Sequence, residues 1–175
     1  YEIIAIGASV GGPMALRTIL GNLNANFPVP IVIVQHMSNG FIHGFAQWLE
    51  ENPLVESVNY PGLQSSTYHK LAKKYLKNGF GAVLSFTVKG TLENTSKLVD
   101  SLKLVSHLAN VGDSKTLIIQ PSATTHQQLS EEEKIASGVL PNLLRISVGT
   151  EHIDDIKADL QQAFEQVFKK ELVSK

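Results

Sequence analysis

Two short apolar runs joined by one helical segment constrain the fold of this chain most strongly. The runs cover residues 3–6 and 31–34, and the second ends at Gln35 and His36. Short uninterrupted apolar runs are typical of strands that are buried on both faces. Between them, Pro13 follows two glycines and marks the first turn of a helix. This order and spacing predict a βαβ unit with two parallel strands and a right-handed crossover.

The rest of the chain predicts four further strands with a less buried face. Apolar and polar residues alternate at 54–62 and 81–90, and shorter strand patterns occupy 116–121 and 143–149. Such alternation favours antiparallel neighbours. We therefore expect a single α/β domain with a mixed sheet of about six strands, the first two parallel, flanked by helices. Two loosely tethered half-domains are the alternative. We also expect the apolar edge at 31–34 to pair with the later strands, because an open edge invites association.

Amphipathic patterns predict the helices that flank this sheet. They cover 40–52, 65–76 with Ser65 or Ser66 as the cap, 94–109, a short helix after the capping box at 130–133, and 152–170. The capping box is Ser130 followed by Glu133, which together satisfy free backbone N–H groups at a helix start.

Composition excludes several functional classes. The chain has 175 residues, 43% hydrophobic and 18% charged, with a net charge of −1 and no cysteine. The evenly spread charge argues against a nucleic-acid partner, and the missing cysteine excludes disulfides and thiolate chemistry. No apolar stretch approaches the ~20 residues that span a membrane, so we expect a cytoplasmic protein. The isolated histidines predict no metal site. Because Tyr1 stands where a natural start would have methionine, we expect an excised or engineered fragment.

The turn Gly7-Ala8-Ser9-Val10-Gly11 has the G-x-S-x-G pattern of a nucleophile elbow. A serine there lies at the carboxyl end of the sheet, and amides near Gly11 and Gly12 can bind an anion. His36 ends the neighbouring strand, within reach of Ser9 as a base. Residues 1–44 resemble the catalytic domain of chemotaxis protein-glutamate methylesterases, with Val10 in place of the usual threonine. The resemblance implies that Ser9 is the nucleophile and His36 its base.

Residues 46–170 resemble a different family. The matching words include "WLEENPLVESVNYPGL", "GFGAVLSFTVKG", "SLKLVSHLANVGDSKTLIIQPSATTHQQLSEEE" and "LLRISVGTEHIDDIKADL". They resemble the C-terminal domain of the O-acetylhomoserine sulfhydrylases, which are pyridoxal-phosphate (PLP) enzymes. The resemblance implies that Arg145 holds a substrate carboxylate, and a guanidinium suits that role. It also places the Schiff-base lysine in another domain, so we expect no cofactor here.

Two unrelated resemblances predict an engineered chimera of segments 1–45 and 46–175, joined within the helix at 40–52. The methylesterase aspartate is absent, and a histidine without its carboxylate is a poorer base by ~10⁴ in serine proteases. We therefore expect no native enzymatic function. The alternatives are a weak serine esterase using Ser9 and His36, or a module that binds an anion at Gly11 and Gly12 or a carboxylate at Arg145. We expect a monomer or an edge-paired dimer.

Overall fold

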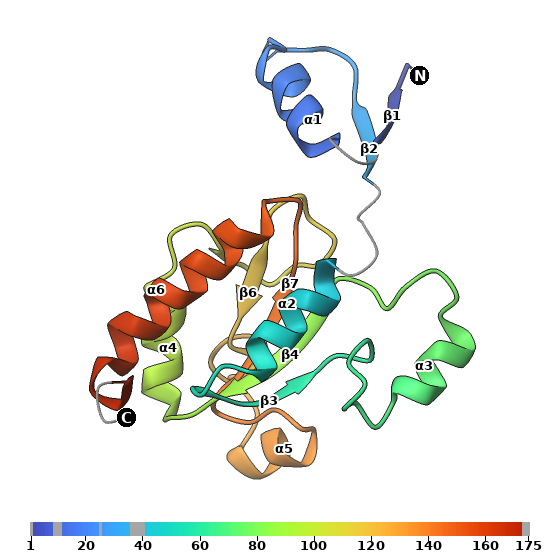
Figure 1. Cartoon of the computed structure of the whole chain (residues 1–175). Helices are drawn as coiled ribbons and strands as arrows, with labels where there is room; N and C mark the ends of the chain where they lie inside the picture. The colour runs from blue at the N-terminus through green and yellow to red at the C-terminus, as the bar shows by residue number, and fades with distance from the viewer. Residues whose placement is uncertain (1, 9–11, 25, 36–40, 173–175) are drawn as a thin grey trace. The chain divides into compact units, whose positions relative to one another are not determined.

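The computed structural model describes residues 2–8, 12–24, 26–35 and 41–172. The chain forms two compact units, Tyr1–Phe41 and Ile42–Lys175, and each is described by itself (Figure 1). No helix in the described ranges is both long enough and apolar enough to cross a membrane.

The first unit is the predicted βαβ arrangement. Strand β1 (Ile4–Ala8) precedes helix α1 (Gly12–Gly21), and strand β2 (Ile31–Gln35) follows. The two strands are parallel, as expected, with register from Ile4 opposite Ile31 to Ala8 opposite Gln35. They form a separate two-stranded sheet, so the expected pairing of β2 with the later strands is wrong. The apolar pattern predicts burial on both faces, yet Val32 is 50% exposed.

The second unit contains a five-stranded mixed sheet in the order β3-β4-β7-β6-β5. The strands are β3 (Val55–Asn59), β4 (Val83–Val88), β5 (Ser106–His107), β6 (Leu117–Ile119) and β7 (Leu143–Ser147). Neighbouring pairs are antiparallel except β5 and β6, which are parallel. The predicted α/β class and mixed sheet are confirmed.

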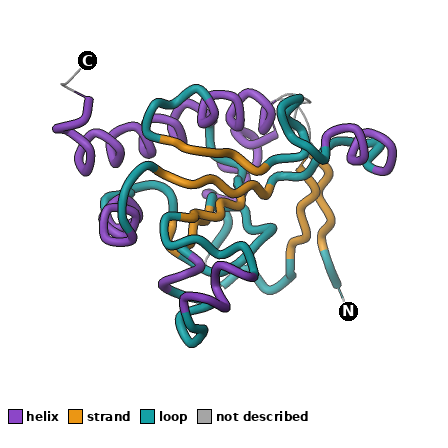
Figure 2. The backbone as a smooth tube through the Cα atoms, turned by 90° about the horizontal axis from the view of Figure 1, so that it is seen from below, coloured by secondary structure: helices purple, strands orange, loops and turns teal. Residues whose placement is uncertain are grey.

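Helices flank this sheet, and Figure 2 shows its strands among helical segments. They are α2 (Phe41–Glu50), α3 (His69–Tyr75), α4 (Leu92–Asp100), α5 (Glu131–Ala136) and α6 (Ile153–Leu172), with a 3₁₀ turn, η1 (Pro121–Ala123). The core forms where apolar helix faces meet the sheet: Phe45 and Leu49 of α2, Leu144 and Ile146 of β7, and Phe164 of α6 are all fully buried. Helices α4 and α6 lie side by side (Figure 1).

Two predicted helices differ from the structure. The helix expected at 94–109 ends at Asp100, and residues 101–105 form a turn and bends before β5. Its backbone is diverted because the Asp159 carboxylate on α6 accepts the N–H groups of residues 103–105. The helix expected at 65–76 begins only at His69, and its N-cap, Tyr68, makes no side-chain capping bond. The capping box at Ser130 is confirmed.

Candidate functional site

Arg145 lies in the middle of β7, at the centre of the second sheet. Its cross-strand neighbours are Ser85 on β4 and Ile119 on β6. The residues beside it on the strand, Leu144 and Ile146, are fully buried on the opposite face, which anchors this strand in the core. Because side chains alternate along a strand, Arg145 belongs to the face away from that packing. A rigid central strand therefore holds the cation, which suits a binding role.

The guanidinium of Arg145 is incompletely paired. One terminal nitrogen, Nη2, donates to the main-chain oxygen of Asn110 at 3.3 Å. The Nε atom is buried and has no hydrogen-bond partner among the described residues. No carboxylate lies within ion-pair distance of the guanidinium in the part of the chain that the structure describes. A buried donor without an acceptor costs about 1–3 kcal/mol, and more for a charged group, so the site favours an added anion.

The residue that contacts Arg145 belongs to a crossover loop, residues 108–116, which joins parallel strands β5 and β6. The loop is fastened to the end of β7: the N–H of Gly112 donates to Ser147 Oγ at 3.3 Å. At its far end, the N–H and the hydroxyl of Thr116 both donate to the Glu151 carboxylate, at 2.8 and 2.7 Å. These contacts place the Asn110 carbonyl beside Arg145.

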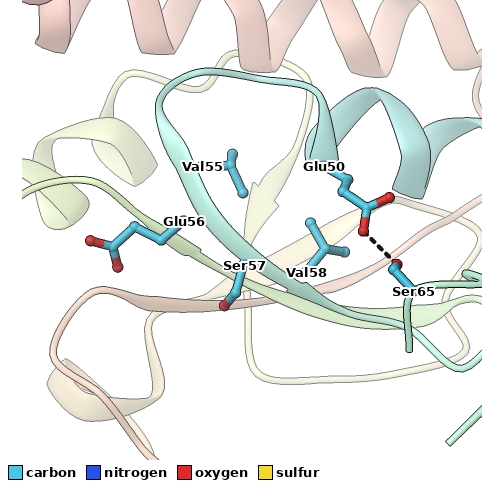
Figure 3. Close-up of a pocket in the computed structure, with 6 residues that line it drawn as sticks. All are labelled: Glu50, Val55, Glu56, Ser57, Val58 and Ser65. Atoms are coloured by element: carbon cyan, nitrogen blue, oxygen red, sulfur yellow. Dashed lines mark hydrogen bonds between the residues drawn. The ribbon is translucent and has the colours of Figure 1, made fainter. Parts of the chain in front are cut away.

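A pocket lies at the edge of the sheet, beside β3. It has a volume of about 260 Å³ and is lined by Glu50, Val55, Glu56, Ser57, Val58 and Ser65. Figure 3 shows Ser65 bonded to Glu50, while Glu56 points away from them. Glu56 instead accepts a bond from Asn142. Two of the lining residues are glutamates and none is a lysine or arginine, so this pocket does not suit a carboxylate or phosphate ligand.

The other predicted site residues lie mainly outside the described residues. Ser9, Gly11 and His36 are among the undescribed positions, so the elbow and its base stay predictions. Gly12 is described as the first residue of α1. The structure thus brings together Arg145 and Asn110, of which the sequence predicted only Arg145. A main-chain carbonyl carries no side-chain signal, so no pattern points to Asn110.

Comparison with known proteins identifies the family. The family model for Cys/Met-metabolism PLP-dependent enzymes matches residues 31–165. The chain belongs to this family. The homocysteine synthase of Schizosaccharomyces pombe is 57% identical over 131 residues, which is 75% of this chain and 30% of that protein. The sulfhydrylase-like protein lolC1 of Epichloe uncinata is 48% identical over 170 residues, 97% of this chain and 35% of that protein.

A solved structure supports the same assignment. An O-acetylhomoserine (thiol)-lyase from Campylobacter jejuni superposes with a TM-score of 0.67 at 44% identity, covering 71% of this chain and 30% of that one. It carries N′-pyridoxyl-lysine-5′-monophosphate. This chain therefore spans about 30% of the length of such relatives.

These comparisons correct the expected engineered chimera without native function. The family match begins at residue 31, inside the segment assigned to the methylesterases, and the lolC1 match extends over nearly the whole chain. One natural enzyme family therefore accounts for both segments, and an engineered origin is wrong. Short βα turns with glycines recur across unrelated folds, which explains the misleading resemblance of residues 1–44.

The expectation of no cofactor is also wrong at the level of the family, which depends on PLP. Enzymes of this kind hold PLP through a Schiff base to a lysine. Lys134, which is buried, is bonded instead to Glu131 at 2.8 Å. Among the described side chains, Arg145 presents a buried donor, Nε, that no acceptor satisfies.

Proposed function

We propose that this chain supplies the carboxylate-binding part of a PLP-dependent sulfhydrylase that acts on an O-acylated amino acid such as O-acetyl-L-homoserine. The buried, unpartnered Nε of Arg145 carries the proposal. Relatives named as homocysteine synthase and as O-acetyl-L-homoserine sulfhydrylase support the reaction class.

The geometry explains how Arg145 would act. A guanidinium presents donors in a fixed fork that matches the two oxygens of a carboxylate. Nε and Nη2 form one edge of this fork; Nη2 donates to the Asn110 oxygen, and Nε is the donor of that edge without a partner among the described residues. A substrate carboxylate on that edge satisfies the buried donor and fixes the orientation of the amino acid. Orientation of this kind is a large part of the advantage of a bound reactant.

Carboxylate binding is tested by nuclear magnetic resonance of the arginine side chains. The sequence has two arginines, Arg145 and the exposed Arg17, so the Nε–H spectrum contains its own control. Titration with O-acetyl-L-homoserine should shift the Arg145 signal saturably, with a dissociation constant of about 1 mM. The Arg17 signal should stay in place.

Two controls make the result specific. The methyl ester of the same amino acid lacks the carboxylate and should leave the Arg145 signal unmoved. Arg145→Gln should abolish saturable binding, whereas Arg17→Gln should not change it. Equal shifts of both arginines, or equal binding of the ester, would contradict the proposal.

A further inference from the structure

We infer that Asp159, far from the sheet face that carries Arg145, is a positioning residue that sets the orientation of the Arg145 guanidinium through the segment 103–110. The inference rests on the proposed carboxylate role of Arg145. It starts from a buried acid to which that role assigns no part: Asp159 is 6% exposed on α6 and makes no ion pair within the described ranges.

The Asp159 carboxylate is saturated by N–H donors. Its Oδ1 accepts from the N–H of Lys103, and its Oδ2 accepts from those of Leu104 and Val105, each at 2.9 Å. The side-chain amide of Gln162 also donates to Oδ1, at 3.2 Å, and to the main-chain oxygen of Ser101, at 2.8 Å. Helix α6 therefore fixes the chain where it leaves α4.

The segment that Asp159 holds continues to Asn110, whose main-chain oxygen contacts Arg145. After residue 105 the chain forms β5, which has two residues and lies at the edge of the sheet. The N–H groups of Ser106 and Leu108 donate to Thr116 and Ile118 at 3.0 and 3.2 Å, and the Asn110 oxygen then accepts from Arg145. Since hydrogen bonds to a charged acceptor are roughly twice as strong as neutral ones, the three to Asp159 hold the start of this segment, while the bonds of Gly112 and Thr116 hold the loop on its far side.

The position of this segment therefore determines which nitrogen of the guanidinium is bonded within the chain and which is not. Because the segment is held at 103–105, the Asn110 carbonyl is held against Nη2, and Nε on the same edge of the guanidinium is left without a partner among the described residues. If Asp159 is released, the carbonyl moves and the guanidinium adopts several orientations. Binding then has to select one of them, which lowers the apparent affinity.

The test is Asp159→Asn, which keeps the shape but turns one acceptor oxygen into a donor that faces backbone N–H groups. Asp155→Asn is the matched control, because Asp155 is an exposed acid on the same helix. We expect Asp159→Asn to shift the Arg145 Nε–H signal without any ligand. We also expect it to weaken binding of O-acetyl-L-homoserine roughly tenfold, about the effect of one lost hydrogen bond to a charged group. The control should change neither.

A double-mutant cycle separates positioning from general destabilisation. The tenfold effect should disappear in the Arg145→Lys background, because a lysine ammonium has no planar set of donors whose orientation matters. Amide signals outside residues 101–116 and α6 should stay in place. If Asp159→Asn does not fold, Gln162→Met removes the supporting amide and should shift the Arg145 signal in the same direction by less.

The two proposals fail in different ways. If the parent chain binds the amino acid but Asp159→Asn changes neither the affinity nor the Arg145 signal, the positioning role is wrong and the proposed function stands. If the parent shows no saturable binding while Asp159→Asn still moves the Arg145 signal, the carboxylate role is wrong and the positioning of the guanidinium stands.

Discussion

Gly149 shows how close two backbone segments come at the end of β7. A Cβ atom at this position would lie 2.4 Å from the Lys115 carbonyl carbon and 2.5 Å from both Ser114 O and Thr116 N. The N–H of Gly149 also donates to Thr116 Oγ1 at 2.9 Å. The absence of a side chain therefore lets the crossover loop pack directly on the strand that carries Arg145.

Gly149→Ala should destabilise the fold, because rigid backbone atoms surround the new methyl group. Overpacking of this kind costs about 1–3 kcal/mol. Gly44→Ala is the control: Gly44 lies in α2 with nothing within 4 Å of its added Cβ, so alanine should raise stability by about 0.5–1 kcal/mol through helix propensity. Urea unfolding of both variants measures the free energies. If both variants changed the free energy of unfolding equally and with the same sign, the backbone around Gly149 would have to move aside without cost.

At this scale the sequence predicted Arg145 through a family resemblance, but it missed the residues that orient it. The Asn110 contribution is a main-chain oxygen, and Asp159 is separated from residues 103–105 by more than fifty positions. Neither has a local motif. A pattern indicates which residue carries charge, whereas the fold decides which partners surround it.

The start of α5 is the helix boundary that local sequence determined best. Ser130 accepts from the N–H of Glu133, and the Glu133 carboxylate accepts from the N–H of Ser130 at 2.8 Å. The same reciprocal pattern joins Thr91 and Asn94 at the start of α4. Helix ends are different: the apolar spacing at Leu98, Leu102 and Val105 predicted a helix through residue 109, yet α4 ends at Asp100. The competing bonds to Asp159 come from a distant element, so periodicity cannot reveal them.

The capping box predicts a local pKa effect. The Ser130 N–H, and to a lesser degree its side chain, hold the pKa of the Glu133 carboxyl below its ordinary value of 4.5. Because the pKa is lowered on folding, the contribution of this box to helix stability is present above pH 4.5 and is lost as the pH falls through the folded value. Ser130→Ala should therefore raise the pKa of Glu133 part of the way back, since the backbone donor remains.

Glu93 is the internal control for this titration. Its pKa is lowered by the hydrogen bond and charge of Lys97, which do not involve Ser130. Carbon-detected pH titration of the glutamates should show Glu133 moving and Glu93 unchanged in Ser130→Ala. Lys97→Met should give the reverse. An unchanged Glu133 would mean that the Ser130 hydroxyl does not influence the carboxylate.

At the scale of the whole molecule, the two units differ in how much of their apolar surface is buried. Among the residues whose burial the structure describes, the buried apolar ones belong to the second unit, except Leu16. In the first unit, side chains of both strands are open to solvent: Ile4 is 38% exposed and Val32 50% exposed. Charge offers little protection, because Glu2 and Arg17 are the charged residues of positions 1–41 when histidine is neutral. Natural edge strands are usually guarded by lysine, proline or a bulge.

This surface carries the prediction that the chain associates reversibly through β1 and β2 as its concentration rises. Val32→Lys places a charge on β2 and should lower the association constant about tenfold or more, since two copies would bring like charges together. Ile135→Lys is the matched control, because Ile135 is 59% exposed on α5 in the second unit. Sedimentation equilibrium at chain concentrations from micromolar to millimolar measures the association constants of both variants and of the parent. A parent chain that stays monomeric over this range, or equal effects of the two lysines, would contradict pairing through the first unit.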